Sequence, residues 1–232
     1  MKADVLVAQR HTLETVIYDE LRKRIISLTY PPGTMIFENV VAADFGVSRT
    51  PVRKAFVHLA ADDLITILPQ RGAQISNLSL VKVKEAQFVR EALEISAFSE
   101  VARIWDSNRE DHRAAETEIL DLIERQKASV VKKDYMLFTQ LDEDYHNRII
   151  EISGNSTLLS MVNHMRAHLN RVRYLELQEA QHEEPAIVFH QQIFDAIRRN
   201  DVTDTAEKLR AHLKMLEDIR DEIFARHPTM FE

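Results

Sequence analysis

Three histidines and one aspartate have the residue types and spacing of metal ligands. Asp142 and His146 are one helical turn apart beside an apolar face, so both side chains can reach one point in space. His190 and His212 each fall on an apolar stripe with helical spacing, which directs both imidazoles toward a helical interior. A carboxylate with three imidazoles suits Zn²⁺, Ni²⁺ or another divalent ion, and an interior site of this kind would keep a coordination position open for a carboxylate effector.

The spacing leaves alternatives open. His164 and His168 have the same one-turn spacing as Asp142 and His146, and periodicity does not say which pair faces the centre. A single histidine on an apolar stripe is also commonly a hydrogen-bonded core residue. The same four residues would suit a metal-dependent enzyme, although no separate residue has a clear claim to be its general base.

A second group of residues has the chemistry of DNA recognition. Arg49 and Arg53 lie one turn apart and share a helix face with Thr50, directly after Ser48, which is a good N-cap residue. Gly46 supplies the positive φ that a tight turn between two short helices requires. A helix that presents guanidinium groups and a hydroxyl at its start can enter the major groove and reach base edges and phosphates.

The elements that carry these arginines are predicted from the spacing of apolar residues. We expect a helix over 13–28, a loop over Tyr30–Thr34, a helix–turn–helix over 37–59 and a β-hairpin over 65–76 whose tip holds Arg71 and Gly72. The apolar positions assigned to the helices before the turn are Val16, Ile17, Leu21, Ile25, Leu28, Val40, Val41 and Phe45.

Beyond a short hinge at 77–80 the periodicity is helical throughout. It predicts helices over 79–105, 109–130, 133–152, 156–178, 184–199 and 202–226, which form an antiparallel bundle with one interior. Residues 1–11 have no clear pattern and are expected to form a flexible arm. The predicted fold class is therefore mainly α, with one small β-hairpin.

Composition and charge narrow the function further. The chain has 232 residues, 45% apolar, no cysteine, no run of membrane-spanning length and no secretory signal at its start, so a cytoplasmic protein without thiolate metal sites is expected. The net charge is −7, but residues 1–76 hold nine Lys/Arg against eight Asp/Glu, and residues 77–232 hold 21 against 29. The acidity belongs to the second part, so the first remains compatible with DNA.

The first part resembles the winged helix–turn–helix of the GntR family of bacterial transcription regulators. The resemblance covers residues 12–76 and rests on PPG, a glutamate followed by AADFGVSRTPVR, then DLI and PQRG, in that order. It implies DNA contacts at Arg49, Arg53, Arg71 and Gly72, beside Thr50. Asn39 stands where many members have arginine, so the resemblance implies either that one DNA contact is lost or that the operator preference is altered. Asp63 stands where a glycine usually closes the recognition helix, and aspartate tolerates that left-handed conformation.

The second part, residues 81–227, is similar to the FCD ligand-binding domain of the FadR-type branch of that family. The similarity rests on Asp142, Tyr145 and His146, then Gly154–Asn155, and then His190 and His212. It implies a divalent metal, Zn or Ni, bound by Asp142, His146, His190 and His212. Six helices resemble the smaller, VanR-like group, and the ligand set disfavours an acyl-CoA effector.

The segment VREALE (89–94) resembles the first bundle helix of that domain, whose arginine can face the pocket. Arg90 is the candidate for binding an effector carboxylate, and a surface ion pair with Glu94 is the alternative. Arg148, Arg166 and Arg173 remain open as other candidates.

Together these features predict a homodimeric, metal-containing transcription regulator and not an enzyme. In such families the regulator is most often a repressor, which here would bind a palindromic operator and respond to an organic or sugar acid. A DNA-binding protein whose bundle only dimerises is the other alternative.

Overall fold

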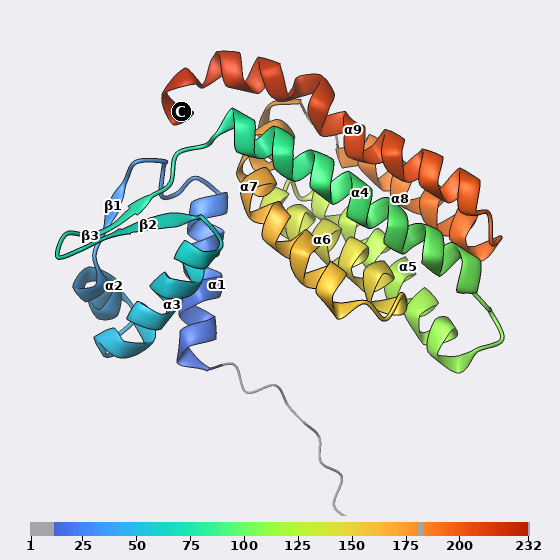
Figure 1. Cartoon of the computed structure of the whole chain (residues 1–232), viewed down its shortest axis with the longest axis horizontal. Coiled ribbons are helices and arrows are strands. Elements are labelled where there is room, and N and C mark those ends of the chain that lie inside the picture. Colours follow the sequence, from blue (N-terminus) through green and yellow to red (C-terminus); the bar gives the residue numbers. More distant parts are fainter. Residues whose placement is uncertain (1–11, 181–182, 232) are drawn as a thin grey trace, which may run out of the picture. The chain divides into compact units, whose positions relative to one another are not determined.

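The computed structural model describes residues 12–180 and 183–231, so the arm expected at residues 1–11 lies outside the described residues. The chain divides into two compact units that meet between Ser76 and Asn77. Figure 1 labels their helices and strands.

The first unit packs three helices with a small sheet. Its elements are α1 (Leu13–Ile26), β1 (Met35–Ile36), α2 (Glu38–Asp44), α3 (Arg49–Ala61), β2 (Ile65–Leu68) and β3 (Gly72–Ile75). The antiparallel sheet has the order β1-β3-β2, with Ile65 opposite Ile75 and Leu68 opposite Gly72. The predicted helix–turn–helix and hairpin are thus confirmed, with Gly46 at φ 63° in the turn and Asp63 at φ 55° after α3.

Several details of the first unit differ from the prediction. β1 was missed because two residues are too short to show alternation, yet Met35 pairs with Gln74. Helix α1 ends at Ile26 and not at Leu28, because Leu28 takes a positive φ of 57°. Val16 and Val40 were assigned to apolar helix faces and are 47% and 59% exposed, since the buried faces are carried by their neighbours Ile17 and Val41.

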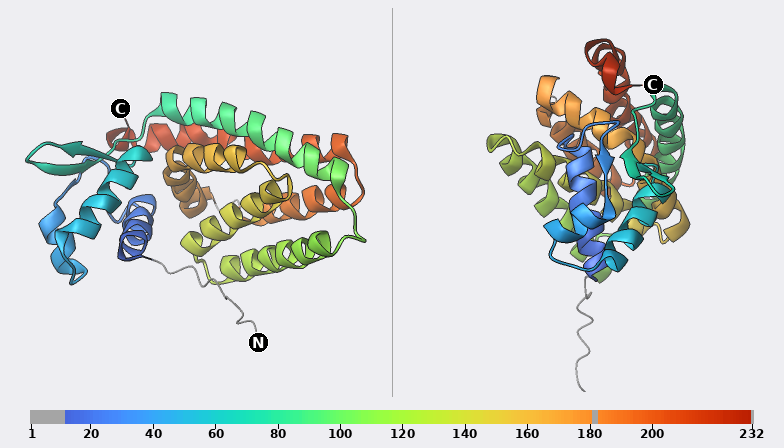
Figure 2. Two further views of the ribbon diagram at one scale, coloured as in Figure 1. Left: turned by 60° about the horizontal axis from the view of Figure 1, so that its bottom comes forward. Right: turned by 90° about the vertical axis from the view of Figure 1, so that its left-hand side faces the viewer.

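The second unit is a bundle of six helices in the part of the chain that the structure describes (Figure 2). They are α4 (Leu80–Ile104), α5 (Glu110–Val131), α6 (Tyr135–Ile152), α7 (Ser156–Ala180), α8 (Glu183–Arg198) and α9 (Val202–Arg226). Three connections are only three residues long, at 132–134, 153–155 and 199–201, so the helices that they join run in opposite directions. The helix boundaries lie within about two residues of those predicted.

The bundle encloses an apolar core built from all six helices, with Phe98, Ile123, Tyr145, Val162 and Phe194 among its buried members. The unit continues past 227, because a short 3₁₀ helix, η1 (Pro228–Met230), is followed by Phe231, which bridges to Leu78. Among the described residues, no helix combines the length and apolarity needed to span a membrane. The fold class is mainly α, as predicted, with three short strands.

Candidate metal centre and DNA-binding face

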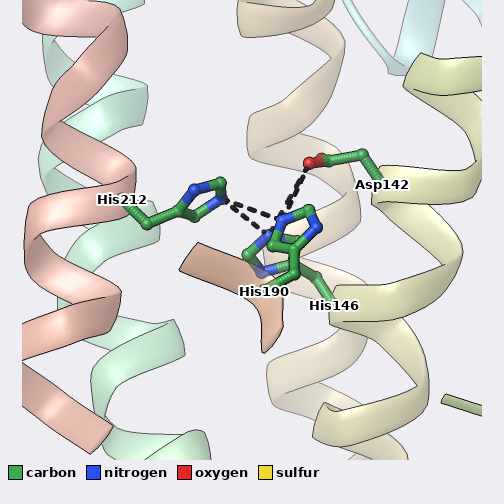
Figure 3. Close-up of side chains that lie close together, drawn as sticks. All are labelled: Asp142, His146, His190 and His212. Carbon is green, nitrogen blue, oxygen red and sulfur yellow. Dashed lines mark hydrogen bonds and ion pairs between the residues drawn. The ribbon is translucent and has the colours of Figure 1, made fainter. Parts of the chain in front are cut away.

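Asp142, His146, His190 and His212 converge at one buried point inside the bundle (Figure 3). The first two side chains come from successive turns of α6, and the imidazoles of His190 and His212 come from α8 and α9. The Nε2 atom of His212 lies 3.2 Å from Nε2 of both His146 and His190. Asp142 Oδ1 lies 3.2 Å from His190 Nε2 and 4.0 Å from His146 Nε2.

Neighbouring side chains determine which nitrogen of two imidazoles faces the centre. His146 Nδ1 lies 2.7 Å from Glu94 Oε2 on α4, and His190 Nδ1 lies 2.7 Å from Gln126 Oε1 on α5. Gln126 uses its amide nitrogen to donate to the Leu141 carbonyl, at 3.0 Å, so its oxygen accepts from His190. His190 Nδ1 therefore carries the proton. His146 Nδ1 also carries it, because a bare nitrogen would repel a carboxylate oxygen 2.7 Å away, although this close contact is not aligned as a hydrogen bond. Both Nε2 atoms then present lone pairs to the centre.

These residues fit a divalent metal ion. Two lone-pair nitrogens cannot hydrogen-bond each other, and one proton on His212 Nε2 cannot satisfy both facing imidazoles fully. Ligands about 2.1 Å from a tetrahedral zinc ion lie roughly 3.4 Å apart, close to the observed separations of 3.2–4.0 Å. The ligand set of three imidazoles and a carboxylate matches the preferences of Zn²⁺ and Ni²⁺.

The protonation states also suit metal binding. Burial lowers the pKa of His146 to about 4, although Glu94 opposes the shift. Burial lowers the pKa of His190 and, with His190 and His146 nearby, holds the pKa of His212 well below its usual value. Burial raises the pKa of Asp142, but Arg173 and the histidines outweigh it, so the pKa lies well below the usual range. Near pH 7 the centre therefore holds neutral imidazoles and an ionised carboxylate.

Arg173 of α7 forms an ion pair with Asp142, the carboxylate of the four-residue centre. Its two terminal nitrogens lie 2.6 Å from the two oxygens of Asp142, a bidentate pair. Arg173 also lines a small cavity together with Arg90 and His212, and Leu177, Ala186 and Leu213 supply apolar walls. Glu176 also lines the cavity. The cavity thus combines one face of the histidine cluster with two guanidinium groups and one carboxylate, and the excess of positive charge suits a small anion.

Arg90 is buried, and so is its ion pair with Glu94. Its Nε lies 2.7 Å from Glu94 Oε1, and both side chains are at most 4% exposed. The alternative of a surface ion pair is therefore wrong, because this face of α4 lies against the bundle interior. The Nη2 atom of Arg90 is buried and finds no hydrogen-bond acceptor among the described residues. Arg90 thus lines the cavity and has one buried donor that no described residue satisfies.

The other arginines and histidines that the sequence left open lie outside the four-residue centre. Arg166 donates to Glu94 at 3.0 Å and to Asn163 at 3.1 Å, deep in the bundle. Arg148 pairs with Glu118 and Glu151 at the surface. His164 and His168 are half-buried on α7, with ring centres 6.2 Å apart, and do not belong to the four-residue centre.

In the first unit, α3 presents its arginines to solvent. Arg49 and Arg53 have side chains that are 62% and 65% exposed, and Thr50 beside them is also exposed. Both guanidinium groups bind Glu38 at the start of α2, at 2.8 Å from Arg49 and 3.2 Å from Arg53. The contacts with Arg53 and Arg49 lower the pKa of Glu38, against the effect of burial. The Glu38 carboxylate therefore holds the side chains of Arg49 and Arg53 together on one face of α3.

The remaining DNA-contact candidates are exposed, with one exception. Asn39 and Arg71 face solvent, whereas Gly72 is partly covered by β1. Gly72 has φ 94°, and a Cβ added there would lie 2.6 Å from the Ile36 carbonyl oxygen. The glycine is therefore required by the sheet itself. Ser48 is the N-cap of α3, as predicted, but its side chain makes no capping hydrogen bond.

Glu94, Gln126 and Arg173 are the important residues that sequence reasoning missed or left undecided. Glu94 was considered only as a partner for Arg90. Glu94 lies on the buried face of α4, but Gln87 and Arg90 lie on the same face, so apolar spacing does not mark this face as buried at Glu94. A buried charged residue is expected to have a partner, and here the sequence pointed only to Arg90.

Comparison with known families identifies the class of protein. Residues 13–75 match "Bacterial regulatory proteins, gntR family", and residues 85–215 match "FCD domain". The chain therefore belongs to the GntR family of transcription regulators, with an FCD domain as its second part, and the resemblance read from the sequence is confirmed.

Individual relatives agree with this assignment. An uncharacterized HTH-type transcriptional regulator of Streptomyces ambofaciens is 33% identical over 93% of this chain and 88% of its own. The HTH-type transcriptional repressor RspR of Escherichia coli is 29% identical over 87% and 86%. The gluconate operon transcriptional repressor of Bacillus subtilis is 32% identical over 63% and 58%. These relatives are transcription regulators and not enzymes, which removes the metal-enzyme alternative.

Solved structures share the fold. E. coli McbR/YncC superposes with a TM-score of 0.79 at 16% identity, covering 92% of this chain and 99% of that one. A GntR regulator from Rhodococcus sp. RHA1 superposes with a TM-score of 0.72 at 19% identity, covering 91% and 97%.

Proposed function

We propose that this GntR-family regulator is a repressor whose operator affinity is controlled by a small organic or sugar acid, bound beside a divalent metal in the bundle. The observation that carries the proposal is the convergence of three imidazoles and Asp142 next to a cavity lined by Arg90 and Arg173. Repressors among the relatives support the direction of regulation.

Each part of the proposed site has a separate task. Asp142, His146, His190 and His212 would hold the metal, which would supply an open coordination position for a carboxylate. Arg90 would donate to the same carboxylate through its unpaired Nη2, and the apolar cavity walls would exclude larger or strongly hydrated ligands. Zn²⁺ and Ni²⁺ are the proposed ions.

The output would be the DNA-binding unit, residues 12–76, acting as one half of a homodimer on a palindromic operator. Arg49, Thr50 and Arg53 would read the major groove, and Arg71 at the tip of the β2–β3 hairpin would approach the backbone or the minor groove. Ligand binding in residues 81–227 would shift the bundle helices and the hinge at 77–80. The two recognition helices would then no longer match half-sites about 34 Å apart.

The experiment is a titration of operator DNA, selected from a random library with the purified protein, in four conditions: chelated protein, Zn²⁺-loaded protein, and each of these with a panel of carboxylic acids. We expect at least one acid to weaken operator binding of the metal-loaded protein by about 5–150-fold, the usual range of allosteric coupling. Operator affinity that is the same in all four conditions contradicts the regulatory role.

The alternative of a bundle that only dimerises makes a different prediction. His190→Ala and His212→Ala would then change stability alone, and the metal content of the wild-type protein would stay at background. Elemental analysis of the three proteins separates this alternative from the proposal.

A further inference from the structure

Glu94 of α4 joins the proposed anion-binding arginine to a proposed metal ligand. Its Oε1 accepts from Arg90 Nε at 2.7 Å and from Arg166 at 3.0 Å, and its Oε2 lies 2.7 Å from His146 Nδ1. The side chain is completely buried. Three helices, α4, α6 and α7, therefore meet at this single group.

The partners of Glu94 differ in how firmly they are held. Arg166 is held by several acceptors besides Glu94, on Glu143, Asn147 and Asn163, so it is fixed in place. Arg90 has one described acceptor, Glu94, and is a lining residue of the cavity. Its Nη2 atom is buried and has no acceptor among the described residues. An anion in the cavity would thus change the position and charge balance of Arg90 and leave Arg166 where it is.

We infer that Glu94 is a positioning residue that couples anion binding at Arg90 to metal binding at His146. The 2.7 Å contact between His146 Nδ1 and Glu94 Oε2 is an ion-pair contact and not an aligned hydrogen bond. A carboxylate placed against Nδ1 orients an imidazole and makes its Nε2 a stronger ligand. A bound anion would offset part of the positive charge that Arg90 places beside Glu94. Glu94 would then be a stronger acceptor for His146. Metal and anion then strengthen each other's binding, because coupling between two sites is reciprocal.

This inference rests on the proposed function and specifies its regulation. Glu94→Gln keeps the size of the side chain and one acceptor oxygen but removes the charge. Glu183→Gln is the matched control, because Glu183 is also a buried glutamate of the bundle, at the start of α8, and does not line the cavity. Full-length wild-type and variant proteins are titrated with Zn²⁺ against a chromophoric chelator, with and without acetate as the carboxylate probe, and the absorption spectrum of the Co²⁺-loaded proteins is recorded.

For Glu94→Gln we expect Zn²⁺ affinity to fall by about 10–100-fold, the usual effect of losing such a supporting contact, with a changed Co²⁺ spectrum and little remaining effect of acetate. Glu183→Gln should behave like the wild type. A Glu94→Gln protein with wild-type Zn²⁺ affinity, Co²⁺ spectrum and acetate response overturns the inference and leaves the proposed function standing. A wild-type protein that binds no Zn²⁺ overturns both.

A measurement on the wild-type protein covers the case in which Glu94→Gln does not fold. In the ¹⁵N-histidine-labelled, Zn²⁺-loaded protein the Nδ1 proton of His146 should give a slowly exchanging resonance, because it is buried against Glu94. Addition of acetate should shift this resonance. If acetate binds, as followed by isothermal titration calorimetry, and the resonance does not move, the coupling through Glu94 is wrong.

Discussion

The side chains of Arg49 and Arg53 on α3 are 62% and 65% exposed, whereas those of Arg90 and Arg173 in the bundle are 4% and 11% exposed. All four arginines bind carboxylates, so the residue type and the partner are the same in both units. An exposed ion pair contributes up to about 1 kcal/mol and exchanges readily for another anion. A buried pair is costly to break, because the remaining partner is left as an uncompensated charge.

The difference shows how one kind of interaction serves two tasks. On α3, Glu38 holds the arginines only weakly, so DNA phosphates and base edges can replace it. In the bundle, Asp142 forms a buried ion pair with Arg173, and Glu94 forms one with Arg90. Removal of either carboxylate leaves a buried charge without its partner and therefore destabilises the bundle. Substitutions in the two units should therefore separate DNA affinity from stability.

The largest effect is expected for Asp142→Ala. The substitution leaves the buried guanidinium of Arg173 without its bidentate partner, and we expect the free energy of unfolding to fall by about 3–5 kcal/mol. Urea denaturation followed by circular dichroism measures it. Asp121→Ala is the control, since Asp121 pairs with Arg125 at the surface and its loss should change stability by less than about 0.5 kcal/mol. Equal effects of the two substitutions would remove the contrast between the units.

The second effect is expected for Arg53→Ala and should appear in DNA binding alone. Loss of one major-groove contact should weaken operator binding by about 1–3 kcal/mol, roughly 10–100-fold, while the stability of this exposed site changes by less than about 0.5 kcal/mol. Fluorescence anisotropy with labelled operator DNA measures the affinity. Lys54→Ala provides the comparison, because Lys54 is equally exposed but pairs with Glu14 of α1. An Arg53→Ala protein that binds the operator like the Lys54→Ala protein would argue against α3 as the reading helix.

Gly72→Ala tests the one DNA-contact candidate that the structure also requires for folding. The positive φ costs about 1–2 kcal/mol for a residue with a Cβ, and the contact with the Ile36 carbonyl adds to this cost. We expect a lower thermal midpoint for the first unit. If stability is unchanged and only operator affinity falls, Gly72 acts in DNA binding and not in the sheet.

The smallest effect is expected for Asn39→Arg, which introduces the arginine common in the family at an exposed position. One added phosphate contact should steepen the dependence of log K on log salt by about 0.9. Operator titrations between about 50 and 200 mM salt measure the slope. An unchanged slope would mean that this position does not reach the DNA backbone.

Much of the fold was predictable because its elements are long and strongly periodic. The six bundle helices and the helix–turn–helix follow from apolar spacing and from breakers such as Gly46 and Gly154. Strand β1 was not predictable, because a strand of two residues exists only through its pairing with β3. Val40 is exposed although it neighbours a buried valine, since α2 is only two turns long and its spacing does not specify which side is buried.

Spacing made Asp142, His146, His190 and His212 candidates but left His164 and His168 open, and the resemblance to the FCD domain decided between the two pairs. The residues that contact these four side chains could not be predicted from the sequence. Glu94 and Gln126 act on His146 and His190 from helices α4 and α5, and no local pattern relates residues so distant in the chain. Periodicity places a side chain on a face, but only the packing of the helices decides which polar group it meets.

The most direct test of the central claim is the metal content of the purified protein. Wild-type chain, His190→Ala and His212→Ala are loaded with Zn²⁺, dialysed extensively and analysed by inductively coupled plasma mass spectrometry. Since a site of three histidines and a carboxylate binds one ion, about one Zn²⁺ per wild-type chain is expected, with the content of both variants close to background. Background metal in the wild-type protein, or equal metal in all three proteins, would contradict the claim that these four residues form a metal centre.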